Sequence, residues 1–212
     1  AEHVKEHRHQ LGKHSLFVGS AVRVPPKDKS VLAVIQEMAL AHAEDRLADL
    51  EGEQRQEAAI ELLASEVLEH AERCRLFREY QGVDARAAEG HVRLARLIKD
   101  GYYSTIFVSE PDDMLERALR AQHMEAAKDY HRLVAGVDEP NDIRVALAES
   151  TRIAIVKCGG DLEEGFLPLT PAEMAQVADD IQGVVQDAFK VFSVFVAMTD
   201  REDAFLARVP RE

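Results

Sequence analysis

The chain has few of the features that assign a protein to a class at once. It holds two cysteines and no tryptophan among its 212 residues, and aromatic residues make up only 6% of it. Two thiols are too few for a disulfide framework, and they exclude a zinc site built from four cysteines. No apolar run approaches the roughly 20 residues that span a bilayer, so we expect no membrane segment.

Positive charge is also scarce, because 26 Lys and Arg face 39 Asp and Glu, for a net charge of -13. Proteins bind nucleic acid by neutralising phosphates with Lys and Arg, and a strongly acidic chain is repelled from phosphates and anionic lipids. The basic stretch Arg73-Cys-Arg-Leu-Phe-Arg78 is flanked by glutamates, which is typical of a solvated helix face with ion pairs. We therefore expect no nucleic-acid partner and no membrane partner. The charged first residues lack an apolar signal core, which favours a cytoplasmic protein.

Short apolar runs alternate along the chain with longer segments whose apolar residues recur at helical spacing. The runs that predict strands are 15–19, 104–108, 132–135, 152–156 and 191–196. The segments that predict helices are 31–50, 54–80, 85–99, 111–121, 142–149, 170–189 and 201–209. Strands that alternate with helices and lack internal polar alternation are typical of a parallel sheet covered on both faces.

We therefore predict an α/β fold with a doubly wound, mostly parallel Rossmann-like sheet. Residues 1–212 form a single domain in this prediction, and the helices between the first two strands form an inserted helical layer at about 31–100. The helix at 170 begins with a cap residue, a first-turn proline and a capping-box glutamate, which are Thr170, Pro171 and Glu173.

Four segments that follow predicted strands carry the most specific signal. They are Gly19-Ser-Ala-Val-Arg23, Val108-Ser-Glu-Pro-Asp112 with the adjoining Asp113-Met-Leu-Glu116, Lys157-Cys-Gly-Gly-Asp-Leu162, and Val196-Ala-Met-Thr199. In order and context they resemble the sirtuin-like (silent-information-regulator-type) NAD-binding domain family, closest to its zinc-free bacterial branch. The resemblance implies a ligand crevice at the carboxyl ends of the strands. Its candidate ligand-binding residues are Gly19, Ser20, Ala21, Arg23, Glu110, Asp112, Gly159, Gly160 and Thr199.

The chain departs from this family at the positions that would carry its chemistry. Gly159 stands where the family has a catalytic histidine, and a glycine has no side chain to accept a proton. Ala21 and Ala197 replace glycines, and Glu110 replaces an asparagine at a point where a carboxylate would repel a phosphate. The neighbouring Cys158 is interpreted as a small buried apolar residue. The resemblance therefore implies a retained fold with a lost catalytic site.

The positions that match the family are structural in kind. Asp112 and Asp161 are suited to capping a helix or bracing a loop. His3 and His7 lie one helical turn apart, but a solvated chain end explains them more simply than a metal site does, so we expect no metal.

The leading hypothesis is a catalytically degenerate sirtuin-like domain that is no longer an enzyme. It would act as an interaction, scaffolding or regulatory module of a larger bacterial protein, and the family's bacterial members often belong to defence systems. We then expect no cofactor, and as partners other domains of a parent protein, separate proteins or further copies of the chain. Two alternatives stay open. The crevice could be a non-catalytic sensor of a NAD or ADP-ribose-like ligand, or the chain could be an active NAD hydrolase with unconventional residues, such as Glu110 as base.

Overall fold

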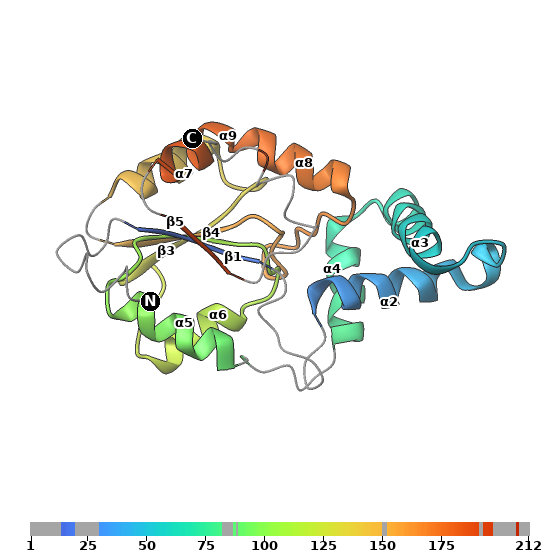
Figure 1. Cartoon of the computed structure of the whole chain (residues 1–212), viewed down its shortest axis with the longest axis horizontal. Helices are drawn as coiled ribbons and strands as arrows, with labels where there is room; N and C mark the ends of the chain where they lie inside the picture. Colours follow the sequence, from blue (N-terminus) through green and yellow to red (C-terminus); the bar gives the residue numbers. More distant parts are fainter. Residues whose placement is uncertain are drawn as a thin grey trace.

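The centre of the molecule is a five-stranded sheet in which all strand pairs are parallel, in the order β3-β4-β2-β1-β5 (Figure 1). The computed structural model describes residues 14–19, 30–81, 87, 89–149, 152–190, 193–196 and 207. The strands are β1 (Ser15–Val18), β2 (Thr105–Val108), β3 (Tyr130–Val134), β4 (Ile153–Lys157) and β5 (Ser193–Val196). The predicted α/β class with a Rossmann-like sheet is confirmed.

Helices cover one face of the sheet with α5 (Glu89–Lys99) and α6 (Met114–Ala121). Alternate residues of a strand point to opposite faces, so Leu16 and Ile106 turn toward these helices. They pack in one buried cluster with Leu94 of α5 and Leu119 of α6. This face of the sheet is therefore closed by apolar packing.

The opposite face is covered by α7 (Pro140–Ala148), α8 (Pro171–Asp180) and α9 (Gln182–Ala188). Phe17 and Phe107 point toward these helices, with their ring centroids 6.0 Å apart. They join Val177 of α8 and Val185 of α9 in a second buried cluster. Burial on both faces explains why the strands read as continuous apolar runs.

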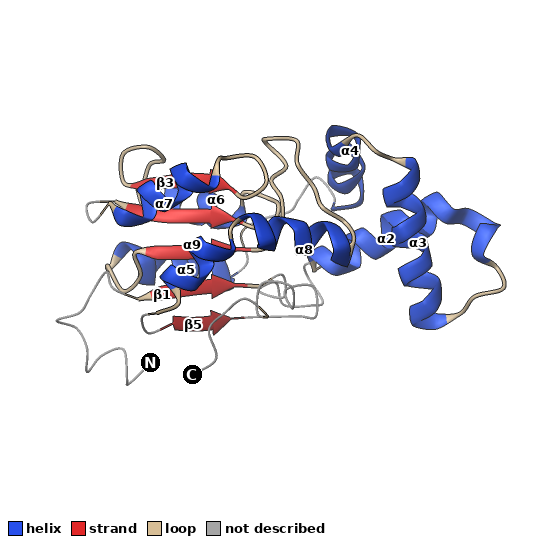
Figure 2. Cartoon of the chain, turned by 90° about the horizontal axis from the view of Figure 1, so that it is seen from above, coloured by secondary structure: helices blue, strands red, loops and turns tan. Residues whose placement is uncertain are grey.

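Four further elements form a lateral extension, here called the arm, beyond the carboxyl ends of the strands (Figure 2). The arm consists of α2 (Val31–Ala43), the short 3-10 helix η2 (Glu44–Leu47), α3 (Gly52–Glu66) and α4 (His70–Gln81). Its own apolar core includes Ile35, Leu63 and Phe77, together with Leu162 and Leu167 from the loop after β4. The helix α5, which we expected within the inserted layer, lies against the sheet instead.

The arm's second helical segment, predicted as one helix over 54–80, is in fact two helices, so that prediction is wrong. The break falls between α3 and α4, at residues 67–69, where the sequence has neither glycine nor proline. Arg73 is buried and donates to the carbonyls of Ala64 at 2.8 Å and Val67 at 2.7 Å. A helix end leaves carbonyls without intrahelical donors, and this guanidinium supplies them.

Other boundaries differ by smaller amounts. The predicted helix 170–189 divides at Ile181 into α8 and α9, and the predicted strand 132–135 lies at 130–134. The predicted capping box is confirmed, since the Glu173 N–H donates to Thr170 Oγ1 at 3.2 Å and the Thr170 N–H donates to Glu173 Oε2 at 3.1 Å. The predicted helix 201–209 lies outside the described residues. Across the ranges that are described, no helix is long and apolar enough to cross a bilayer.

Candidate functional site

Gly19 and the predicted site loops after β2 and β4 meet at the carboxyl edge of the sheet, because they follow the neighbouring strands β1, β2 and β4. The Ser109 N–H donates to the Val18 carbonyl at 3.0 Å, and the Cys158 N–H donates to the Val108 carbonyl at 2.8 Å. These bonds continue the ladder past the strand ends. The structure thus brings to one edge Gly19, Glu110, Asp112, Gly159 and Gly160. The other candidates lie outside the described residues: Ser20, Ala21, Arg23 and Thr199.

Gly159 lies against the backbone of the loop after β2. A β-carbon built on Gly159 would stand 1.8 Å from the Ser109 carbonyl oxygen and 2.6 Å from its carbon. Those atoms belong to backbone that is held to β1 and cannot swing away like a flexible side chain. A histidine at residue 159 would therefore require the loops after β2 and β4 to separate. The adjacent Cys158 is fully buried, as predicted.

Gly160 is constrained independently of its neighbour. Its φ is +100°, a conformation that side chains of L-residues rarely adopt. A β-carbon there would also meet the Phe166 carbonyl oxygen at 2.6 Å. The backbone path between β4 and the loop that follows it therefore requires glycine at both residue 159 and residue 160.

The side chain of Glu110 contacts a histidine on helix α5. Its Oε2 lies 2.5 Å from Nε2 of His91 on α5, and the side chains are 1% and 0% exposed, respectively. A buried charged carboxylate is costly unless it is paired and hydrogen-bonded, and the imidazole supplies such a partner. The sequence analysis did not identify His91 as a site residue, because no spacing links residue 91 to residue 110.

Asp112 braces the edge, as its position suggested. Its Oδ2 accepts from Nε2 of Gln81 at 2.7 Å, and its Oδ1 accepts from the Met114 N–H at 3.2 Å. The first bond reaches the last residue of α4, and the second satisfies a free N–H in the first turn of α6. Asp112 therefore connects the arm to the helical layer of the sheet.

A buried cluster of charges lies beneath these loops. The side chain of Lys157, at the end of β4, is completely buried, donates to the Asp112 carbonyl and lies 3.4 Å from Oε1 of Glu116. Among the described residues Glu116 accepts no hydrogen bond, so charge attraction alone holds its carboxylate beside Lys157 and Arg132. Lys157 and Glu116 thus have a role in holding the loops together.

Arg132 of β3 adds the second cation of this cluster. It pairs with Asp161 and, at 3.2 Å, with Glu163. Burial lowers the pKa of Arg132, but Asp161 and its other acidic neighbours raise it further, so the pKa lies above its ordinary value. Oδ1 of Asp161 also accepts from the Glu163 N–H at 2.8 Å. Asp161 therefore braces the loop after β4, as proposed from the sequence, but its cationic partner was missed because Arg132 stands in an apolar strand without a motif.

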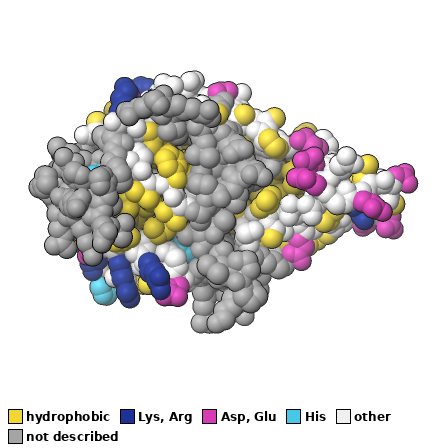
Figure 3. Space-filling view, viewed as in Figure 1, with side chains coloured by type: hydrophobic (Ala, Val, Ile, Leu, Met, Phe, Trp, Pro, Cys, Tyr) yellow, Lys and Arg dark blue, Asp and Glu magenta, His cyan; other side chains and the backbone are white. Residues whose placement is uncertain are grey.

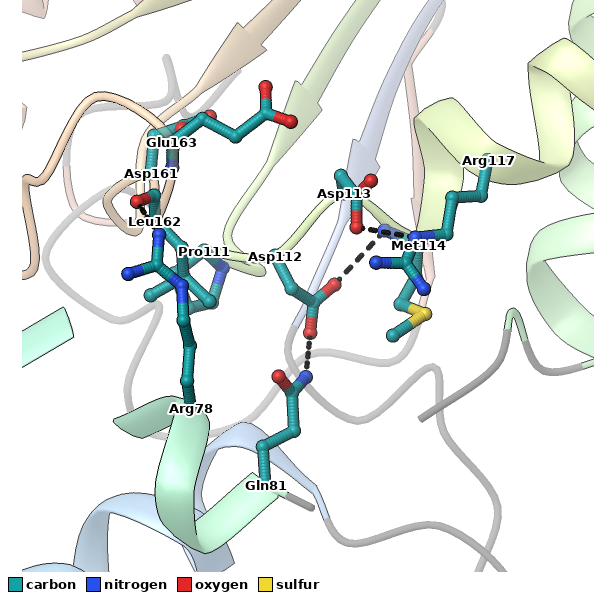
Figure 4. A pocket seen from close by; sticks show the side chains of 10 residues that line it. All are labelled: Arg78, Gln81, Pro111, Asp112, Asp113, Met114, Arg117, Asp161, Leu162 and Glu163. Atoms are coloured by element: carbon teal, nitrogen blue, oxygen red, sulfur yellow. Dashed lines mark hydrogen bonds and ion pairs between the residues drawn. The ribbon is translucent and has the colours of Figure 1, made fainter. Parts of the chain in front are cut away.

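A pocket of about 490 Å³ opens between the arm and this edge (Figure 4). Helix α4 contributes Arg78 and Gln81, the loop after β2 and the start of α6 contribute five residues, and the loop after β4 contributes three. These eight residues of the sheet side are Pro111, Asp112, Asp113, Met114, Arg117, Asp161, Leu162 and Glu163. Of the predicted ligand-binding residues that the structure describes, only Asp112 lines the pocket.

The pocket's charges are mixed. Arg78 donates to the Leu162 carbonyl, and Arg117 pairs with Asp113 at 2.8 Å. Burial raises the pKa of Asp113, but Arg117 and Arg120 lower it further, so it lies below its ordinary value. Two guanidinium groups therefore flank the central Asp112 carboxylate, an arrangement that suits a ligand with both anionic and donor groups.

In the part of the chain that the structure describes, no three His, Cys, Asp or Glu side chains converge to hold a metal ion.

The fold places the chain among α/β proteins with a parallel Rossmann-like sheet. No model of a known protein family matches the chain, and no curated protein matches it.

Proposed function

We propose that the chain is a catalytically degenerate sirtuin-like domain that serves as an interaction or regulatory module of a larger protein. The observation that carries this proposal is the packing of Gly159 against Ser109, which leaves 1.8 Å for a β-carbon at the position of the family's catalytic histidine. A general base must stand within hydrogen-bond reach of the proton that it removes. Residue 159 cannot supply one in this backbone.

The neighbouring residues support the same proposal. Glu110, the remaining candidate base, is buried and in contact with His91. Lys157 and Asp161 match family motifs, yet both belong to the charge cluster that holds the loops. The matching residues Lys157 and Asp161 therefore stabilise the loops. The catalytic side chain is missing at residue 159, and Glu110 is buried against His91.

The test is incubation of the purified chain with NAD, followed by chromatography for nicotinamide. We expect no release above the rate without protein. Glu110→Gln keeps the size of the side chain, and Glu69→Gln on the exposed surface of the arm serves as its matched control. Protein-dependent release that Glu110→Gln abolishes and Glu69→Gln preserves would refute the proposal and favour an unconventional NAD hydrolase.

A second candidate function is sensing of a nucleotide-like ligand, and the pocket favours it. Its volume of about 490 Å³ lies within the range of small-molecule sites. Its walls come from both the arm and the sheet edge, so a ligand bound there would contact the arm and the sheet at once. Such a ligand would shift the arm toward the arrangement that it binds more tightly, by as much as its affinities for the two arrangements differ.

Calorimetry with NAD and with ADP-ribose tests this candidate. If either binds, Arg78→Ala is expected to weaken binding at least tenfold, or about 1.4 kcal/mol. Arg75→Ala, one turn earlier on α4 and paired with Glu72, should leave the affinity unchanged. Absence of binding heat with both ligands would remove the sensor and leave the interaction module.

A further inference from the structure

The molecule carries opposite charges at two places that are far apart. Figure 3 shows acidic side chains gathered on the arm and Lys and Arg side chains on the α5–α6 side of the sheet. In Figures 1 and 2 the arm extends past the carboxyl ends of the strands, whereas α5 and α6 lie flat against the sheet. The two charged regions therefore lie on different sides of the molecule.

The acidic region is the outer end of the arm, here called the arm tip. It carries six exposed carboxylates on η2, the following turn and the start of α3: Glu44, Asp45, Asp49, Glu51, Glu53 and Glu57. Within the described ranges none of the six belongs to an ion pair, and the nearby Arg46 is already paired with Glu66 at 2.8 Å. Six like charges therefore face solvent together, although each adjacent pair repels.

The basic region is the outer surface of α5 and α6, here called the basic face. The exposed side chains that define it are Arg93, Arg96, Lys99 and Arg120. Lys99 donates to the Gln122 carbonyl at 2.8 Å, which places the last turns of both helices side by side. Arg93 is paired with Glu89, and Arg120 shares Asp113 with a second arginine, whereas Arg96 forms no ion pair with any described residue. The basic face thus keeps a positive surplus in a chain whose net charge is -13.

An apolar element accompanies the charges on both surfaces. Leu97, which is 38% exposed, lies on α5 directly after Arg96. At the arm tip Leu47 and Leu50 are partly exposed between the carboxylates. Contact between the two surfaces would therefore remove apolar area from water as well as pair charges.

We propose that the basic face docks the arm tip of a second copy of this chain. The opposite charges match in sign, and the separation of the two regions makes the contact intermolecular. Because two different surfaces meet, the contact is heterologous, and copies add head to tail into a closed ring or an open filament. Neither surface includes Gly159 or Glu110, so this inference stands or falls independently of the nicotinamide test.

Sedimentation velocity of the full chain over a range of concentrations tests the proposal. We expect mass to increase with concentration at low ionic strength and to return to that of one chain near 1 M salt, where the screening length is about 3 Å. Charge reversal of the basic face by Arg96→Glu with Lys99→Glu should abolish association. Glu53→Lys with Glu57→Lys, which leaves four carboxylates beside two lysines at the arm tip, should abolish it as well.

The decisive sample is a mixture of the two reversed variants. Each variant alone should remain a single chain. In the mixture the unaltered arm tip of one variant meets the unaltered basic face of the other, so the two should associate pairwise and grow no further. As a control, Arg144→Glu with Lys190→Glu makes the same change in net charge on the opposite side of the sheet and should not reduce association. The proposal is overturned if the wild-type chain stays single at all salt concentrations, if the control dissociates it equally, or if the mixture stays single. Circular dichroism of each variant verifies folding.

Discussion

At the end of β4 the chain passes so close to Ser109 that only a hydrogen atom fits on the α-carbon of residue 159. The Ser109 carbonyl oxygen would stand 1.8 Å from any β-carbon placed there. The glycine is therefore required by the path of two backbones, whatever chemistry the edge performs.

Gly159→Ala should destabilise the chain by about 3 kcal/mol, the upper range for overpacking, because the obstacle is backbone rather than a flexible side chain. Gly183→Ala is the matched control. Gly183 lies inside α9, where its β-carbon would meet only the end of Arg144 at 3.3 Å. Since alanine favours helix over glycine, this control should be neutral or about 0.5 kcal/mol more stable.

Urea unfolding of both variants measures the difference. A Gly159→Ala variant as stable as Gly183→Ala would contradict the tight approach of the loops.

His91 and Glu110 give a second expectation at the scale of the residue. Replacing His91 by alanine removes one hydrogen-bond partner of the buried Glu110 side chain, a loss that typically costs about 1 to 3 kcal/mol. His91→Gln retains a side-chain N–H donor and should lose clearly less. Denaturant midpoints of the two variants provide the measurement, and equal losses would mean that the contact contributes through packing volume alone.

Helix α4 attaches the arm to the rest of the molecule at several places. Its Arg73 bonds to the end of α3 and lies 2.8 Å from Glu173 of α8, and its Gln81 bonds to Asp112 after β2. Because these contacts reach separate elements, the position of α4 determines the position of the whole arm relative to the sheet.

The pair formed by Arg73 and Glu173 should make this junction sensitive to acid. Burial raises the pKa of Glu173, but the Leu169 N–H, Arg73 and the Thr170 N–H lower it further, so its pKa lies below the ordinary value of 4.5. A carboxyl whose pKa is depressed by folding stabilises the fold above its unfolded pKa, and this contribution is lost as pH falls through the folded pKa.

We therefore expect wild type to be more stable than Glu173→Gln at pH 7, and the gap to narrow as pH falls below about 4.5. Denaturant unfolding of both chains from pH 7 to pH 3 measures it. A gap that stays constant over this range would exclude an ionised Glu173 from the junction.

The elements also show what the sequence could and could not predict. The strands and most helices follow from apolar spacing, and the capping box at Thr170 follows from three adjacent residues. The break between α3 and α4 could not be predicted, because no glycine or proline marks it and the bonds from Arg73 to Ala64 and Val67 form only in the folded chain. The partner of Glu110 was missed for the same reason, since only the packing of α5 on the sheet brings His91 to it.

The site was predictable in location and only partly in composition. Loops after adjacent parallel strands must meet at one edge, so Glu110, Asp112 and Gly159 lie together there, and their role as a ligand site stays a prediction. The pocket itself draws Arg78 and Gln81 from the arm, and an amphipathic helix does not reveal which loop its polar ends will face.

On the scale of the whole molecule, the apolar interior is divided between the sheet and the arm. Cys158 lies in the sheet core with Phe17 and Phe107, whereas Cys74 lies in the arm core with Phe77 and Leu63. The two thiols are both buried, and they are the only cysteines of the chain. The labelling rate of Cys158 can therefore report opening of the sheet core, and that of Cys74 opening of the arm core.

We expect both thiols to resist labelling in the native chain at pH 8. Burial raises the pKa of Cys74 to about 11, so little of it is the reactive thiolate. Arg73→Lys, which removes most of the guanidinium's hydrogen bonds, should accelerate labelling of Cys74 roughly tenfold through local opening of the arm and leave Cys158 unchanged. Mass spectrometry of the two peptides gives both rates. Parallel acceleration of both thiols would show that arm and sheet open as one cooperative unit.

The pairing of β1 has a consequence for the order in which a nascent chain can fold. Ser15 of β1 pairs with Thr105 of β2, which is synthesised 90 residues later, and the other neighbour, β5, follows later still. At ordinary translation speeds of about 5 to 20 residues per second, β1 leaves the ribosome roughly 5 to 20 seconds before its first hydrogen-bonding neighbour. The helices of the arm emerge during that interval and can pair locally, while the apolar β1 strand must wait. The arm helices thus emerge ahead of the strands that pair with β1, although the arm core is completed only when Leu162 and Leu167 follow. Shielding of β1 during this delay becomes a condition for productive synthesis.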